Sequence, residues 1–305
     1  MPTPFADRLA EAVRTKQSAL VVGLDPQLEK LPLELRRAAD AGASDARERA
    51  AAALRAFDAA VIELVAPFAV AVKPQSAFYE RWGAPGVAAY EHAAETARAA
   101  GLLVIGDIKR GDIGTTAAAY AEGHLVAPEH PAARADAVTL NPLLGTDSIA
   151  PFLAAMSATG GGCFVLVRTS NPSATELQDL RVDGRALHEH VAELVARWGQ
   201  RHVGACGYSS VGAVVGATAP DELRRLRARL PQAWFLVPGV GAQGATADDV
   251  AAAFDADGLG AVVNSSRGIL YAYGEPAAPA WKDAVRGAAR TLRDQLRRAA
   301  QSALR

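Results

Sequence analysis

The residues best suited to chemistry lie in one short segment, Asp107-Ile-Lys-Arg-Gly-Asp112, at the end of an apolar run. If that run is a strand, Asp107 and Lys109 leave it on the same face, because side chains alternate along a strand. Asp112 follows a glycine turn and could return to the same region or reach a neighbour. The spacing alone favours an ion-pair network that only ties strands together, so a catalytic interpretation needs a further residue.

Lys73 supplies that further residue. The chain holds five lysines among 32 basic residues, so a lysine kept in the apolar run 68–73 stands out. Two ammonium groups and two carboxylates nearly cancel, so a cluster of them avoids the large cost of an isolated buried charge. We therefore expect Lys73, Asp107, Lys109 and Asp112 to form a catalytic array that holds one lysine charged beside a reacting carbon.

Short apolar runs alternate along the chain with alanine-rich stretches of helical period, among them 46–65, 185–198 and 246–254. Continuously apolar runs are typical of strands buried on both faces of a parallel sheet. We expect eight strands, at 19–24, 68–73, 102–107, 137–140, 163–167, 203–205, 234–237 and 261–263. Eight βα units predict an α/β fold, a (β/α)8 TIM barrel. We expect residues 1–305 to form it as a single domain with extra N- and C-terminal helices. A doubly wound sheet is less favoured, because no glycine-rich turn follows the first strand.

Barrel enzymes carry their active sites at the carboxyl ends of the strands. The predicted ends include Asp25 after the first strand, Gly207-Tyr-Ser-Ser210 after the sixth and Pro238 after the seventh. The glycines that follow Pro238 allow an anion to approach the backbone, and Gln243 among them can donate and accept. Arg267, after the eighth strand, offers a planar fork for phosphate. These loops predict a site for a mononucleotide or a sugar phosphate rather than a dinucleotide.

Composition excludes several classes of protein. Half of the residues are hydrophobic and the formal net charge is −1, which argues against a disordered chain and against a nucleic-acid binder. The longest apolar run, 65–72, is far shorter than the roughly 20 residues that span a bilayer, and we expect no signal peptide. Cys163 and Cys206 fit core positions in a reducing cytosol. We therefore expect a cytoplasmic protein without a membrane partner.

We expect no bound metal. His188 and His190 are two residues apart in a predicted helix, so they face different sides and make a poor pair of ligands. A solvated helix face is the better interpretation of both histidines. No other group of His, Cys and carboxylate residues in the sequence has the spacing of metal ligands.

Seven segments together resemble one enzyme family. They are GLDP at 23–26, AVKPQSAFYE at 71–80, GDIKRGDIGTT at 106–116, TLNPLLGTDS at 139–148, VRTSNPSA at 167–174, PGVGAQG at 238–244 and NSSRG at 264–268. Their order, over about residues 17–275, is similar to orotidine 5′-phosphate decarboxylase in its longer, type 2 branch. The resemblance implies a homodimeric barrel that converts orotidine 5′-phosphate to UMP and CO2, the last step of de novo UMP synthesis. It also implies that no metal or organic cofactor takes part.

The resemblance further implies a role for each site residue. In the array, Lys109 is the proton donor and Asp112 is lent by the partner subunit, so that each site spans the dimer interface. Asp25 and Thr116 contact ribose hydroxyls, Thr116 again from across the dimer, and Ser170 contacts the amide edge of the pyrimidine. The remaining substrate contacts are Pro238 and the two phosphate ligands, Gln243 and Arg267.

Loss of CO2 would leave a carbanion on an sp2 ring carbon. A fixed ammonium at Lys109 would stabilise that charge and then protonate the carbon. Other functions remain open. A metal-dependent sugar-phosphate decarboxylase shares the barrel and the D-x-K-x-x-D pattern, and a non-catalytic barrel could bind a nucleotide without turnover. A phosphate-binding isomerase would need a carboxylate base at the end of the sixth strand, where we expect none.

Overall fold

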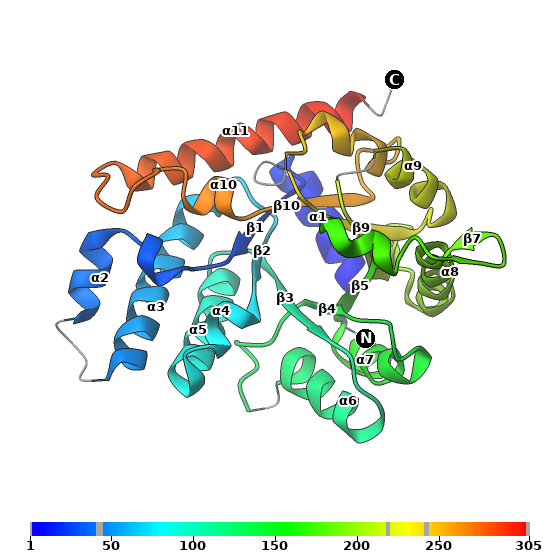
Figure 1. Ribbon diagram of the computed structural model, residues 1–305, viewed down its shortest axis with the longest axis horizontal. Helices are drawn as coiled ribbons and strands as arrows, with labels where there is room; N and C mark the ends of the chain where they lie inside the picture. The colour runs from blue at the N-terminus through cyan, green and yellow to red at the C-terminus, as the bar shows by residue number, and fades with distance from the viewer. Residues whose placement is uncertain (1, 41–44, 128, 218–219, 241–243, 303–305) are drawn as a thin grey trace.

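The computed structural model describes residues 2–40, 45–127, 129–217, 220–240 and 244–302. Within these residues, eight parallel strands close into a barrel in the order β1-β10-β9-β8-β5-β4-β3-β2 (Figure 1). The barrel strands are β1 (Leu20–Leu24), β2 (Ala71–Pro74), β3 (Leu103–Arg110), β4 (Ala137–Leu140), β5 (Gly162–Arg168), β8 (Ser209–Val215), β9 (Ala233–Pro238) and β10 (Ala261–Ser265). The predicted TIM barrel is confirmed. That residues 1–305 form a single domain stays a prediction.

Helices surround the barrel (Figure 1). The α-helices are α1 (Phe5–Lys16), α2 (Leu33–Asp40), α3 (Ala46–Val65), α4 (Ser76–Glu80), α5 (Gly83–Ala99), α6 (Gly114–Ala121), α7 (Thr146–Thr159), α8 (Leu187–Gly199), α9 (Pro220–Arg229), α10 (Arg267–Leu270) and α11 (Trp281–Ser302). Shorter turns are η1 (Leu28–Lys30), η2 (Glu122–Val126), η3 (Pro172–Glu176), η4 (Gln200–His202) and η5 (Asp248–Ala253). A two-stranded antiparallel hairpin, β6 (Arg181–Val182) with β7 (Arg185–Ala186), lies outside the barrel.

The N-terminal helix α1 packs against the amino ends of the strands. Its Phe5 meets Phe164 of β5 edge to face, with ring centroids 5.9 Å apart. The N–H of Ala6 donates to the hydroxyl of Ser210, at the start of β8 (3.1 Å). Phe5, Ala6 and Leu9 belong to an apolar cluster that also includes Phe164 and buried side chains of several other strands. Because α1 fills this end, the opposite, carboxyl end is left for a site.

The sixth barrel strand differs from the prediction. It is β8 at Ser209–Val215 and not 203–205, where Val203 makes only an isolated bridge to Ser209. Gly207–Ser210 therefore leads into the strand, with Ser209 and Ser210 as its first residues, and lies at the end of the barrel away from the expected site. The small residue Gly212 obscures the strand pattern, and it is required there because a Cβ atom would lie 2.6 Å from the ring of Phe164.

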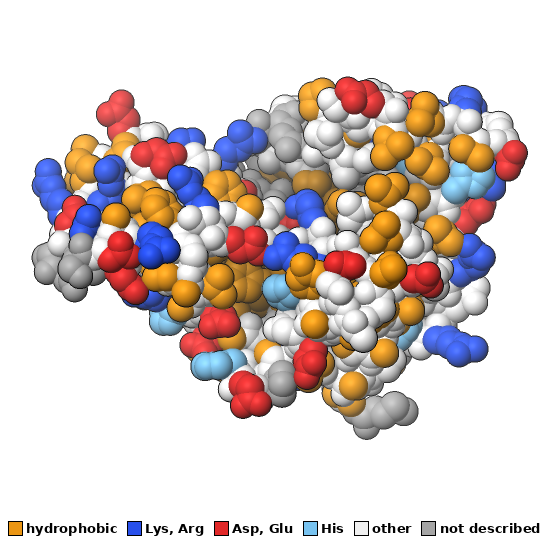
Figure 2. All heavy atoms as spheres, turned by 60° about the horizontal axis from the view of Figure 1, so that its bottom comes forward, with side chains coloured by type: hydrophobic (Ala, Val, Ile, Leu, Met, Phe, Trp, Pro, Cys, Tyr) orange, Lys and Arg blue, Asp and Glu red, His pale blue; other side chains and the backbone are white. Residues whose placement is uncertain are grey.

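One predicted helix also differs from the structure. The stretch 246–254, expected as an α-helix, forms the 3-10 helix η5. Among the described residues, none of the helices combines the length and the apolar character needed to cross a membrane. Figure 2 shows basic, acidic and hydrophobic side chains mixed over the face that it presents, in keeping with the net charge of −1.

Candidate active site

Three residues of the expected array meet at the carboxyl ends of β2 and β3. The carboxylate of Asp107 accepts a hydrogen bond from Lys73 on one oxygen and from Lys109 on the other. The side chains of Lys73 and Asp107 are each 7% exposed, whereas that of Lys109 is 45% exposed. One carboxylate thus holds a buried ammonium behind it and an accessible ammonium in front.

The charges in this cluster stabilise one another. Burial alone would lower the pKa of Lys73, but the carboxylates of Asp107 and Asp25 outweigh it and raise that pKa. Burial alone would raise the pKa of Asp107, but Lys73 and Lys109 hold it well below its usual range. Asp107 therefore stays ionised at neutral pH, as an electrostatic anchor requires.

Regular strand geometry does not bring Lys109 to Asp107. Lys109 has φ of 45°, in the left-handed region that non-glycine residues seldom adopt. The pairing of β3 with β4 shifts register between Gly106 and Arg110, so the strand is irregular where Lys109 leaves it. Backbone strain of this kind persists only where surrounding contacts compensate for it, and it clusters at functional sites.

Thr139 of β4 provides one such contact. Its side chain is buried, and its hydroxyl accepts a hydrogen bond from the backbone N–H of Lys109 (3.0 Å) and donates one to Asp107 (2.9 Å). The hydroxyl therefore fixes both the backbone of one member of the cluster and the carboxylate of another. Thr139 is a functional residue that was not predicted, although it is the one polar residue in an otherwise apolar four-residue strand.

A cavity of about 440 Å³ opens beside this cluster. Its lining mixes apolar side chains with a few convergent polar ones, as in binding sites for small molecules. It is lined by Lys73, Asp107, Lys109, Thr139, Leu166, Thr169, Ser170, Asn171, Gln178, Val214, Leu236 and Pro238. The expected substrate residues Ser170 and Pro238 are thus brought to the same cavity as the charged cluster.

Three other expected substrate residues are placed differently. Asp25 follows β1, half-buried, and its Oδ1 atom is buried without a hydrogen-bond partner. Arg267 begins α10 with its side chain exposed. Gln243 lies outside the described residues. Neither Asp25 nor Arg267 lines the cavity beside the cluster.

Asp112 and Thr116 do not join the array of their own chain. Asp112 accepts a hydrogen bond from the N–H of the next residue, Ile113 (2.8 Å), and Thr116 is exposed on α6. Large apolar side chains are exposed next to Asp112, at Ile113 (53%), and in the loop between β4 and α7, at Leu143 (71%) and Leu144 (51%). The four-residue array is therefore incomplete within one chain.

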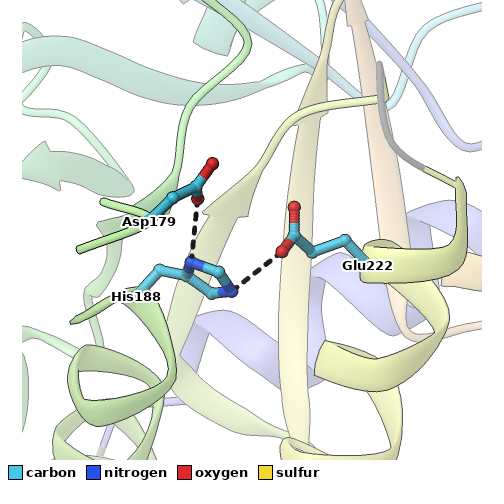
Figure 3. Close-up of side chains that lie close together, drawn as sticks. All are labelled: Asp179, His188 and Glu222. Carbon is cyan, nitrogen blue, oxygen red and sulfur yellow. Dashed lines mark ion pairs between the residues drawn. The ribbon is translucent and has the colours of Figure 1, made fainter. Parts of the chain in front are cut away.

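The interpretation of His188 as part of a solvated helix face is wrong. His188 is 4% exposed and lies between Asp179 and Glu222, as Figure 3 shows. A signal was present, because His188 stands four residues before Ala192 and so shares the buried stripe of α8. The three side chains offer possible ligand atoms within 4.8 Å of one another. The guanidinium of Arg168 contacts both carboxylates, so it already compensates part of their negative charge.

Comparison with known proteins identifies the family to which this chain is similar. A family model described as orotidine 5′-phosphate decarboxylase / HUMPS family matches residues 18–282. The chain is 44% identical to the orotidine 5′-phosphate decarboxylase of Rhodopirellula baltica, over 96% of this chain and 99% of the relative. It is 43% identical to that of Deinococcus radiodurans, over 97% and 98%.

Solved structures that are similar to this one include a member of the same family. The structure of the OMP decarboxylase of Leishmania donovani is similar to this one with a TM-score of 0.77 and 35% sequence identity, over 98% of this chain and 100% of that one. The family model covers most of the chain, and the curated relatives match it almost from end to end. The chain belongs to the orotidine 5′-phosphate decarboxylase / HUMPS family.

Proposed function

We propose that this protein removes CO2 from orotidine 5′-phosphate to give UMP, the last step of de novo pyrimidine biosynthesis. The observation that carries the proposal is the Lys73–Asp107–Lys109 cluster at the mouth of the cavity. Full-length relatives named for this reaction support it. In the reaction, the bond between the ring carbon and the carboxyl carbon breaks, CO2 leaves, and the electron pair stays on the ring carbon.

Lys109 is the group that faces this electron pair. Its ammonium is held by Asp107, and its side chain is open to the cavity. A positive charge that is fixed before the reaction stabilises the developing carbanion without reorganisation. A proton then moves from Nζ to the ring carbon to complete UMP, and the neutral amine regains a proton from water. We assign no step to a metal or an organic cofactor, because the ammonium supplies both the charge and the proton.

The rest of the substrate is held by residues at the ends of other strands. Ser170 contacts the amide edge of the pyrimidine and Pro238 packs beside it, which fits their position in the cavity. Asp25, with a buried and unpartnered oxygen, accepts from a ribose hydroxyl. Gln243 and Arg267 bind the phosphate. The glycine at 239, with φ of 115°, lets the backbone after β9 approach it closely.

The functional unit in this proposal is a homodimer. Asp112 and Thr116 do not line the cavity of their own chain, and in this proposal they complete the site of the partner. The exposed side chains of Ile113, Leu143 and Leu144 supply apolar surface around them, which an interface would bury. A second copy of the chain would thus both complete the charged array and cover the exposed apolar side chains.

The cytoplasm is the compartment we propose for this reaction. Cys163 and Cys206 are both free, and a reducing compartment preserves free thiols. Burial raises the pKa of the Cys163 thiol to about 12, so this residue is an inert part of the core.

The test is a spectrophotometric assay that follows the loss of orotidine 5′-phosphate absorbance with and without EDTA. We expect equal rates in both, since the ammonium does the work. Activity that disappears with EDTA and returns with a divalent metal would favour the sugar-phosphate decarboxylase. Binding of UMP without consumption of orotidine 5′-phosphate would favour the non-catalytic barrel.

A further inference from the structure

The wall of the cavity between β5 and α8 is built from a segment that leaves the barrel and returns. Thr169, Ser170 and Asn171 line the cavity on the way out, and Gln178 lines it on the way back. Most of the residues between Asn171 and Gln178 are solvent-exposed, with Leu177 48% exposed, and only Ala174 among them is buried. An exposed excursion with few buried contacts is among the less stable parts of a fold. Its place over the cavity must therefore be set by contacts near its two ends.

Gln178 joins those two ends. Its side-chain oxygen accepts from the backbone N–H of Thr169 (2.9 Å), and its amide nitrogen donates to the hydroxyl of the same residue (2.8 Å). Its backbone carbonyl in turn accepts from the backbone N–H of His188 (3.0 Å) and from the ring nitrogen Nδ1 (2.9 Å). His188 thus holds the residue that closes the excursion.

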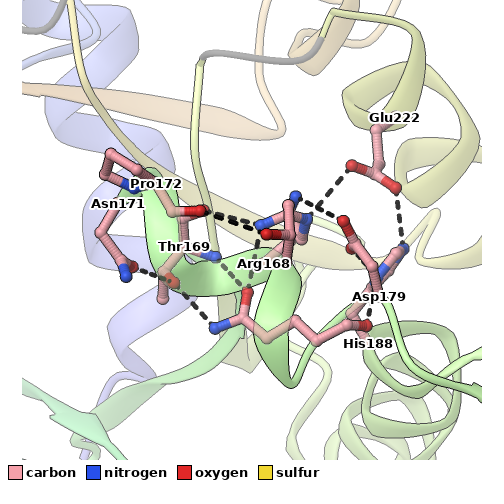
Figure 4. A network of polar contacts seen from close by, with 9 residues as sticks. Arg168, Thr169, Asn171, Pro172, Asp179, His188 and Glu222 are labelled. Carbon is pink, nitrogen blue, oxygen red and sulfur yellow. Dashed lines mark hydrogen bonds and ion pairs between the residues drawn. The ribbon is translucent and has the colours of Figure 1, made fainter.

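His188 and Arg168 belong to one network drawn from four parts of the fold (Figure 4). Nε2 of His188 lies 3.0 Å from Glu222 of α9, and Nδ1 also lies 3.5 Å from Asp179. Arg168, the last residue of β5, contacts Glu222 (3.2 Å) and Asp179 (3.1 Å). Both ring nitrogens of His188 lie within reach of oxygen acceptors, so whichever nitrogen carries a hydrogen has a partner. The ring and the guanidinium of Arg168 thus share the two carboxylates, Asp179 and Glu222.

Gly216, which follows β8, contacts the cavity wall at Arg168 and Ser170. The N–H of Gly216 donates to the carbonyl of Arg168 (2.8 Å). A Cβ atom on Gly216 would lie 2.9 Å from the Cβ atom of Ser170, so the absence of a side chain there lets Ser170 approach. Ser170 therefore sits between a backbone contact on one side and the excursion closed by Gln178 on the other.

We infer that His188 is a positioning residue for the pyrimidine-binding wall, acting through Gln178 and held in place by Glu222 and Arg168. The inference rests on the proposed function, since it takes Ser170 and its neighbours to contact the base. His188 lines no part of the cavity and touches no reacting atom. Its loss should loosen contacts to the base and leave the Lys109 cluster intact.

The experiment compares two ligands that differ by the base. UMP and ribose 5-phosphate share a ribose and a phosphate, and only UMP reaches the pyrimidine-binding wall. For His188→Leu we expect the Kd of UMP to rise about 10-fold or more, as for the loss of a buried hydrogen bond, with the Kd of ribose 5-phosphate unchanged. In turnover, the KM for orotidine 5′-phosphate should rise more than kcat falls.

Two further variants serve as controls. His188→Asn keeps a donor near the place of Nδ1, so it should restore most of the UMP affinity. His190→Ala removes a histidine of the same helix that contacts Arg185 and Val182 instead of Gln178, and it should behave like the wild type. Should His188→Leu fail to fold, Glu222→Ala removes the other partner of the ring and is tested with the same two ligands.

The outcomes separate the two ideas. A wild-type protein that does not consume orotidine 5′-phosphate refutes the proposed function. An active wild type whose folded His188→Leu or Glu222→Ala variant binds UMP normally overturns the inference. Equal weakening of UMP and ribose 5-phosphate also overturns it, because a general loss of structure would affect both ligands alike.

Discussion

Replacing Thr139 by valine tests whether the hydroxyl behind the charged cluster matters for chemistry. Valine keeps the shape of threonine but has no hydroxyl, so the N–H of Lys109 and one oxygen of Asp107 each lose a partner. Asp107 keeps its two lysines and stays ionised. The change is therefore confined to how Lys109 and Asp107 are oriented.

The size of the effect follows from those two contacts. A buried N–H without a partner costs about 1–3 kcal/mol, and a hydrogen bond to a charged group contributes a similar amount. The left-handed backbone at Lys109 stores about 1–3 kcal/mol of strain, which the Thr139 contact helps to hold. We expect Thr139→Val to lower the free energy of unfolding by about 2 kcal/mol. We expect kcat to fall about 10- to 100-fold as the ammonium moves off its target.

Thr139→Ser is the matched control. Serine keeps the hydroxyl and loses one buried methyl group, which costs about 1 kcal/mol of stability. We expect its kcat to stay within about threefold of the wild type, with KM little changed in either variant. The assay is steady-state decarboxylation, with urea unfolding in parallel. A valine variant that is folded and as active as the serine variant would refute the argument, because the hydroxyl would then have no part in turnover.

Three further predictions follow from the same geometry. Lys109→Ala should fold and lose at least about 10²- to 10³-fold in rate, and near-normal turnover by it would exclude Lys109 as the proton donor. If each site is shared between two subunits, mixing the inactive Lys109→Ala and Asp112→Ala variants should restore about a quarter of wild-type activity after subunit exchange. Half of the dimers are then mixed, and each mixed dimer has one intact site out of two. An absence of recovery despite verified exchange would exclude a shared site. Burial raises the pKa of Asp58 to about 8; the hydrogen bond from Tyr79 acts in the opposite direction, and the nearby charge of Asp25 adds to the increase. The folded state then keeps a proton that the unfolded state releases above about pH 4, so stability falls as pH rises to about 8. Urea unfolding at about pH 5.5 and 7.5 should show this loss, about 2 kcal/mol, in the wild type but not in Asp58→Asn; parallel pH dependences would contradict it.

Much of the fold could be predicted because buried strands have a recognisable pattern of apolar residues in the sequence. Strands such as β1 and β10 are buried along their whole length, so they appear as continuous apolar runs. The strand β8 was misplaced because Gly212, which must be small to pass Phe164, dilutes the apolar pattern. Neither the total number of strands nor the closure of the barrel depended on that error.

The site was only partly predictable, for a different reason. Lys73 and Asp107 meet because neighbouring parallel strands end at the same edge, and strand order can be expected from the sequence. The left-handed backbone of Lys109 and the role of Thr139 depend on an irregular pairing of β3 with β4, which no residue pattern announces. His188 was misjudged because its partners, Asp179 and Glu222, are distant in sequence from one another.

The placement of charge in the cluster favours one of its two lysines as the proton donor of the proposed reaction. Within one chain, both ammonium groups contact the carboxylate of Asp107, and the carboxylate of Asp25 also acts on Lys73. Lys109 presents the more accessible positive charge, because its side chain is 45% exposed while that of Lys73 is 7% exposed. An accessible cation that lines a cavity attracts an anionic ligand. If Asp112 of a second copy approaches, as we propose, Lys109 is held from two sides. In the proposed reaction, decarboxylation places new negative charge beside the more accessible ammonium, and we therefore propose Lys109, and not Lys73, as the group that protonates the ring.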